Sequence, residues 1–198
     1  MPTIGIDPWG LFILQYVDKN NSNNVVTSTG ELKIGTTNNG YGLFSYSDSP
    51  VLTKNAAGEL VISLPIGLSI NGSALKDSSS FEEGTTVTYV PHNGDLGSTL
   101  NLGIKEVAIA HEKGHADAFF RANFKGTMSD AIKVLNIDES LPLETISSQF
   151  YFAISRAHSS AIRGAWKDIL SGADAPTISA LEANGWKKVE TEENVWEK

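Results

Sequence analysis

The stretch EVAIAHEKGHADAFF, residues 106–120, contains the strongest pattern in the sequence and decides the fold of the region around it. Apolar and small residues recur there at steps of three and four positions, which is the spacing of one face of an α-helix. The sequence therefore predicts a helix from about Gly103 to about Phe124. His111 and His115 are four positions apart, so their side chains lie one above the other on the inward-facing side of this helix.

Within this helix, His111, Glu112 and His115 form the pattern HExxH. Two imidazoles one helical turn apart can bind the same divalent ion, and the neighbouring carboxylate can accept a proton from a water molecule that the metal activates. Because the sequence has no cysteine, any metal site must use histidine and carboxylate ligands. The pattern predicts Zn²⁺ as the cofactor, with His111 and His115 as ligands and Glu112 as the catalytic base.

The third ligand is not determined by the motif. We expect His158 first, because its neighbours are small and let its helix approach another closely, and Glu144 as the alternative. Both lie on one predicted helix about 21 Å apart, so only one of them can reach the metal. The weaker candidates are Asp117, Asp130, Glu139 and His92. His92 precedes the metal helix in a predicted loop, where a histidine is usually solvated but could line the cleft or bind the metal.

The chain as a whole is expected to have an α+β fold, with an antiparallel β-rich N-terminal region packed on a helical C-terminal region. Short apolar runs separated by Asn, Ser and Gly predict strands in the β-rich part, residues 12–100. These strands are expected at 11–17, 31–36, 41–47, 59–70 and 85–90, with a turn at 20–24. Pro65 is expected to break or bend the fourth strand, because it cannot donate to the ladder.

The helical part is expected over residues 101–184. After the metal helix, the spacing predicts a short helix near 127–136 and a long helix from Leu143 to Leu170. Pro176 in a first turn and Gly185 as a C-cap predict one more helix. Residues 185–198 are expected to form a closing hairpin in which Trp186 and Trp196 are cross-strand partners.

Charge and hydropathy exclude some classes of function. Fifteen Lys and Arg stand against 23 Asp and Glu, a formal charge of −8, so the basic surface typical of nucleic-acid binding is not expected. No stretch approaches the length of a membrane-spanning helix, and the N-terminus lacks the pattern of a signal peptide. We therefore expect no nucleic-acid partner, no membrane span and no signal peptide.

The HExxH stretch resembles the active-site helix of zincin metallopeptidases. That resemblance implies the same roles for His111 and His115 as ligands and for Glu112 as base. Gly114 also fits, because a residue without a side chain lets a neighbouring element approach the metal helix closely. Where the extended metzincin pattern has a third histidine, this sequence has Arg121, so the resemblance does not extend to that subclass.

The beginning of the chain, PTIGIDPWGL at residues 2–11, resembles the end of the core of rearrangement-hotspot (Rhs) proteins. In that family the core forms a shell around a variable C-terminal effector, which self-cleavage releases. The resemblance implies that residues 1–11 are the end of the core, that cleavage follows Leu11, and that residues 12–198 are the released toxin domain. It also implies a cognate immunity protein and delivery into a target cell by a specialised secretion or toxin-complex system.

These interpretations together predict a zinc metallopeptidase that acts as an Rhs effector and hydrolyses a peptide bond in a target-cell protein. One alternative keeps the metal and changes the substrate to an amide of peptidoglycan. Another is a non-enzymatic binding module in which the HExxH pattern is accidental.

Overall fold

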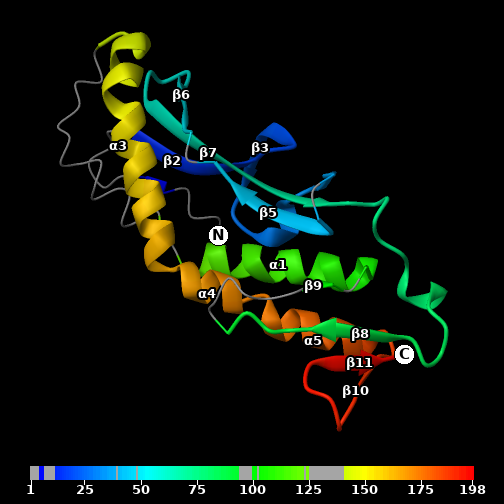
Figure 1. Ribbon diagram of the computed structural model, residues 1–198. Coiled ribbons are helices and arrows are strands. Elements are labelled where there is room, and N and C mark those ends of the chain that lie inside the picture. The colour runs from blue at the N-terminus through cyan, green and yellow to red at the C-terminus, as the bar shows by residue number, and fades with distance from the viewer. Residues whose placement is uncertain are drawn as a thin grey trace. The chain divides into compact units, whose positions relative to one another are not determined.

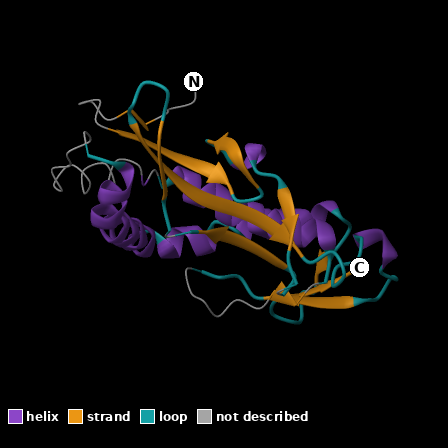
Figure 2. Cartoon of the chain, turned by 90° about the horizontal axis from the view of Figure 1, so that it is seen from above, coloured by secondary structure: helices purple, strands orange, loops and turns teal. Residues whose placement is uncertain are grey.

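The computed structural model describes residues 5–6, 12–38, 40–47, 49–93, 100–101, 103–122, 124 and 141–198. It has a mixed α+β architecture, as expected, with most strands in the first half of the chain and the described α-helices in the second half (Figures 1 and 2). The chain divides into two compact units. The first comprises Met1–Lys33, Ser45–Gly67 and Ala122–Ala165, and the second comprises Ile34–Phe44, Leu68–Arg121 and Trp166–Lys198.

The first unit contains two long apolar strands, β2 (Phe12–Asp18) and β7 (Leu60–Ile70), which pair in parallel with Leu14 opposite Ile62. The expectation of a purely antiparallel region was therefore wrong. Hairpins do form, because β3 (Asn21–Val26) is antiparallel to β2 and β6 (Val51–Lys54) is antiparallel to β7. The longer strand of each hairpin, β2 or β7, is buried along most of its length. These two strands pair with each other at the centre of the sheet.

Two further expectations for this unit are corrected. The segment predicted as a turn at residues 20–24 lies mostly in β3, because an outer strand with a mostly exposed pattern accepts Asn and Ser once it is paired. Strand β7 is not broken at Pro65, which lies opposite Val17 within the strand. The carbonyl oxygen of Pro65 accepts a hydrogen bond of 2.8 Å from the N–H of Ser47, so the residue still takes part in sheet pairing.

Helix α3 (Leu143–Gly164) also belongs to the first unit, where it contacts β6 (Figure 1). The sequence predicted one helix from Leu143 to Leu170, but α3 ends at Gly164 and a separate α4 (Trp166–Ser171) follows. Ala165 has φ −103° and ψ 8°, outside the helical range, and the weak helix propensity of Gly164 favours a break at this point. The predicted helix near 127–136 lies outside the described residues.

The second unit contains α1 (Lys105–Arg121), α4 and α5 (Asp174–Ala183), and α1 contacts both of the others. A small sheet runs in the order β10 (Lys187–Lys188), β11 (Val195–Glu197), β8 (Thr86–Tyr89) and β9 (Leu100–Asn101). Figure 1 shows α1 and α5 next to this sheet. The unit also includes β4 (Ile34–Thr36), which pairs in parallel with the end of β7, and the beginning of β5 (Gly42–Tyr46).

The core of the second unit joins this sheet to the helices through Val87, Tyr89, Ile104, Val107, Leu181, Trp186 and Trp196. The closing hairpin predicted near the C-terminus is present as β10 and β11. The two tryptophans are not cross-strand partners, however, because Trp196 lies opposite Lys188 and Trp186 precedes β10. Both side chains reach the same core from different positions. No helix among the described residues is sufficiently long and apolar to span a membrane.

Candidate metal centre

Helix α1 presents both histidines of the HExxH pattern to one buried point in the second unit. His111 and His115 are 4% and 9% exposed, and their ring centroids are 4.6 Å apart. The Nε2 atoms of the two rings are separated by 3.1 Å. The predicted helix and the predicted pairing of these two side chains are confirmed, with bounds two or three residues inside the expected ones.

A third histidine, His92, completes the cluster from the segment that follows β8. Its ring is 8% exposed and stacks on that of His111, with 3.3 Å between the two Nε2 atoms. Each of the three histidines offers a ring nitrogen within 4.8 Å of the others, and among the described residues this is the one group of three or more ligating side chains that converges in this way. The buried cluster could therefore bind a metal ion.

The hydrogen bonds behind His111 and His115 determine which ring nitrogen carries the proton. The Oγ1 atom of Thr177 donates to the carbonyl of Ala173 at 2.6 Å, so it accepts from Nδ1–H of His111, 3.0 Å away. The carbonyl oxygen of Ile169 can only accept, so the Nδ1 atom of His115, 2.8 Å from it, carries a proton. Both Nε2 atoms therefore direct lone pairs towards the same point, an arrangement that a cation between them would stabilise.

Glycines allow α1 to approach these partners. A Cβ atom at Gly114 would lie 2.6 Å from Cα of Ala173 and 2.8 Å from the carbonyl oxygen of Gly172, so no larger residue fits without a shift of the backbone. The interpretation of Gly114 as a site of close helix approach is confirmed. The approach brings Thr177 and the carbonyl of Ile169 within reach of the two imidazoles.

Glu112 is buried beside the histidines on α1, with 6% of its surface exposed. Its Oε2 atom accepts a hydrogen bond from the backbone N–H of Phe44 in β5. Burial raises the pKa of its carboxyl to about 7, against the lowering effect of that hydrogen bond. Burial also lowers the pKa of His111 to about 3, with His115 and His92 contributing, and lowers the pKa of His115.

The other predicted ligands lie elsewhere or outside the described residues. His158 and Glu144 are both on α3 in the first unit, where His158 is fully buried with its ring about 6 Å from those of Tyr16 and Tyr46 and Glu144 is exposed. Their roles as ligands remain predictions. Asp117 is exposed on α1, and Asp130 and Glu139 lie outside the described residues.

The burial of His92 was not predicted from the sequence, and neither were the hydrogen bonds made by Asp174, Thr177 and the carbonyl of Ile169. A histidine in a loop has no periodic pattern to indicate burial, and a backbone carbonyl has no sequence signal. The sequence contained one weak indication of the roles of Thr177 and Asp174. Both are polar residues near the start of the helix that Pro176 had predicted.

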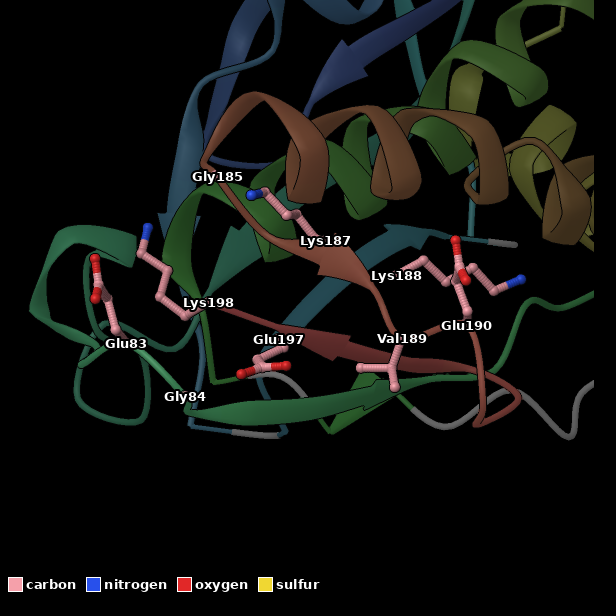
Figure 3. Close-up of a pocket in the computed structure, with 9 residues that line it drawn as sticks. All are labelled: Glu83, Gly84, Gly185, Lys187, Lys188, Val189, Glu190, Glu197 and Lys198. Carbon is pink, nitrogen blue, oxygen red and sulfur yellow. The ribbon is translucent and has the colours of Figure 1, made fainter.

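The second unit also has a pocket of about 700 Å³, and none of the three histidines lines it (Figure 3). Six charged side chains line this pocket, and their charges balance. They are Lys187, Lys188, Lys198, Glu83, Glu190 and Glu197. Lys198 is engaged within the unit, because its Nζ donates to the carbonyl oxygen of Asn184 at 2.6 Å. The histidine cluster is therefore the better candidate for a functional site.

Comparisons with protein-family models, with curated proteins and with solved structures found no match to this chain.

Proposed function

We propose that the chain is a zinc-dependent hydrolase in which His92, His111 and His115 hold the metal and Glu112 is the general base. The observation that carries the proposal is the convergence of the ring nitrogens of the three histidines, with the buried Glu112 next to His111 along α1. His92 takes the place of the third ligand for which His158 and Glu144 were expected.

The spacing of the ring nitrogens supports zinc. At Zn–N distances of about 2.0–2.1 Å, two ligands of a tetrahedral ion lie about 3.3–3.4 Å apart. The Nε2 atom of His111 is 3.1 Å from that of His115 and 3.3 Å from that of His92. Three nitrogen ligands also leave one position of a tetrahedral ion for water or substrate, which is typical of catalytic rather than structural zinc.

The reaction we propose is hydrolysis of a peptide bond. When bound, Zn²⁺ supplies a Lewis acid that lowers the pKa of a water molecule and polarises the carbonyl group under attack. Glu112 accepts the proton of the attacking water and transfers it to the amine nitrogen that leaves as the C–N bond breaks. The burial of Glu112 and of the three imidazoles keeps bulk water away from these proton transfers.

In biological terms we propose that this hydrolase is the effector of an Rhs-type toxin that acts on a target-cell protein. The support is the resemblance of residues 2–11 to the end of an Rhs core, a segment that lies almost entirely outside the described residues. The proposed partners are the Rhs shell, an immunity protein and the target protein, and the proposed location is the cell into which the toxin is delivered.

To test this proposal, the full chain is expressed in a bacterium as the wild type and as the variants Glu112→Gln and Glu182→Gln. Glu182 is exposed on α5, so its replacement is a control that makes the same change of charge. We expect growth arrest by the wild type and the control only, with near-stoichiometric zinc in all three purified proteins. Full toxicity of Glu112→Gln would contradict the catalytic role. Arrest only after export to the periplasm would indicate peptidoglycan as the substrate, and a protein without zinc would indicate an accidental motif.

The zinc content of two further variants decides the third ligand. We expect His92→Ala to lose most of its bound zinc and His158→Ala to keep it. The reverse result would return His158 to that role.

A further inference from the structure

One carboxylate, that of Asp174, receives three hydrogen bonds from the segment that carries His92. Its Oδ1 atom accepts from the hydroxyl of Tyr89 at 2.7 Å and from the backbone N–H of His92 at 2.7 Å. Its Oδ2 atom accepts from the backbone N–H of Asn93 at 3.1 Å. Both oxygens are therefore used, and every donor lies between the end of β8 and Asn93.

The backbone of this segment is shaped to present its N–H groups to Asp174. Asn93 has φ 47°, in the left-handed region that asparagine tolerates better than most residues. Two consecutive N–H groups consequently face one carboxylate. The hydroxyl of Tyr89 is protonated at neutral pH and donates to Asp174, and burial, with a further contribution from Asp174, raises its pKa above the ordinary value. The position of the His92 backbone is thus determined by side-chain contacts rather than by regular secondary structure.

Asp174 shares its helix with a partner of another ligand. Thr177 lies three positions later on α5, so the two side chains lie near one another along the helix. Thr177 accepts from His111, while Asp174 holds the backbone of His92. The first turn of α5 therefore positions two histidines that come from different parts of the chain.

We infer that Asp174 is a positioning residue that keeps His92 within reach of the metal held by His111 and His115. The inference rests on the proposed function in one respect, that the three histidines bind a metal ion. The competing explanation is that Asp174 stabilises the N-terminus of α5 only, as acidic residues in a first turn do. That role would affect the stability of the helix without any link to His92.

The test is a double-mutant cycle on zinc affinity, measured by competition with a chelating dye on the full chain. The variants are Asp174→Asn, His92→Ala and both together, with Asp168→Asn as a control. Asp168 carries the same charge on α4 and is exposed. We expect Asp174→Asn to bind zinc about 10- to 100-fold more weakly than the wild type, the range usual for an outer partner of a ligand, and Asp168→Asn to change little.

The combination with His92→Ala separates the two explanations. If Asp174 acts through His92, its replacement has no further effect once His92 is absent. An equal loss of affinity in both backgrounds, or an unchanged affinity of Asp174→Asn, would overturn the inference. If Asp174→Asn does not fold, Tyr89→Phe replaces it in the cycle, because this variant removes one donor and leaves the carboxylate. We expect a smaller loss of zinc affinity, seen only in the proteins that retain His92. An unchanged zinc affinity would count against the role of Asp174.

Assays of hydrolysis on the same proteins keep the two proposals distinguishable. Zinc binding that depends on Asp174 and His92, without any hydrolysis, would contradict the proposed function and support the inference. If Asp174→Asn keeps both the hydrolysis and the zinc affinity of the wild type, the proposed function is supported and the inference about Asp174 is contradicted.

Discussion

The carboxylate of Glu112 accepts a hydrogen bond of 2.5 Å from the backbone N–H of Phe44, which ties the proposed base on α1 to strand β5. Gly42, two residues earlier in the strand, lies against the same side chain: a Cβ atom there would be 2.7 Å from Cγ and 2.9 Å from Oε1 of Glu112. The orientation of the Glu112 carboxylate therefore depends on the absence of a side chain at Gly42 as well as on the hydrogen bond from the N–H of Phe44.

The first prediction concerns Gly42. We expect Gly42→Ala to displace the carboxylate of Glu112 and to reduce hydrolysis about 100-fold, the order of loss that a displacement near 1 Å causes in an active site. Zinc affinity should stay close to that of the wild type, because none of the three histidines is affected. Gly72→Ala is the control, since a Cβ atom at Gly72 would meet nothing within 4 Å. Equal activity of the two variants would contradict the proposed role of Glu112.

A second prediction concerns the hydroxyl of Thr177. Replacement by Val keeps the shape of the side chain but removes the acceptor for Nδ1–H of His111, so we expect about 10-fold weaker zinc binding. Leaving that buried N–H without a partner should also lower the free energy of unfolding by about 1–3 kcal/mol. Thr177→Ser retains the hydroxyl and should restore most of the zinc affinity. If Ser and Val bind zinc equally, the hydroxyl does not orient His111.

The third prediction concerns the close approach at Gly114. An alanine there must push the backbone of Gly172 and Ala173 away, and we expect a loss of about 1–3 kcal/mol in the free energy of unfolding, as for other overpacked sites. Gly164→Ala is the matched control, because a Cβ atom at that helical glycine would have nothing within 4 Å. Its helix propensity should leave stability unchanged or slightly higher. Denaturant unfolding of the metal-free proteins measures both, and equal midpoints would refute the packing argument.

The fourth prediction concerns the pH dependence of stability in the metal-free protein. The pKa of His111 falls from 6.5 to about 3 on folding, so the unfolded chain binds more protons between these values and stability decreases as the pH falls below 6.5. The lowered pKa of His115 acts in the same direction. The pKa of Glu112 rises from 4.5 to about 7, so ionising it costs stability as the pH rises through that window. The two effects oppose each other between pH 5 and 6.5.

Glu112→Gln removes the opposing contribution and should make the stability rise more steeply between pH 5 and 6.5 than in the wild type. His111 alone should contribute about 2 kcal/mol over that interval. Urea unfolding at several pH values, with chelator present throughout, measures the slopes. Identical slopes for wild type and Glu112→Gln would show that Glu112 does not titrate in this window.

Local patterns were sufficient for the parts of the site that one helix creates. The contact between His111 and His115 and the close packing at Gly114 follow from helical geometry, and both were predicted. The burial of His92 was not predicted, and the carboxylate that accepts from its backbone N–H, that of Asp174, lies 82 positions further along the chain. The partner of His115 is a backbone carbonyl, which any residue type would provide.

The same distinction explains the errors in the fold. The hairpins of β2 with β3 and of β6 with β7 join neighbouring segments, but the parallel pairing of β2 with β7 joins segments such as those of Gln15 and Ser63, 48 positions apart. Short polar connections indicate turns and carry no information about which strands become central. The break between α3 and α4 depended on a single glycine whose effect on a helix varies with its surroundings.

The order in which the chain is synthesised has a consequence for the centre on α1. Ile169, whose carbonyl holds His115, follows that histidine by 54 positions, and Thr177 and Asp174 come later still. A ribosome-bound chain that already displays all three imidazoles therefore lacks every group that orients them. The arrangement of the three imidazoles described above therefore cannot be complete before α5 has been synthesised, and the proposed metal site forms only after that point.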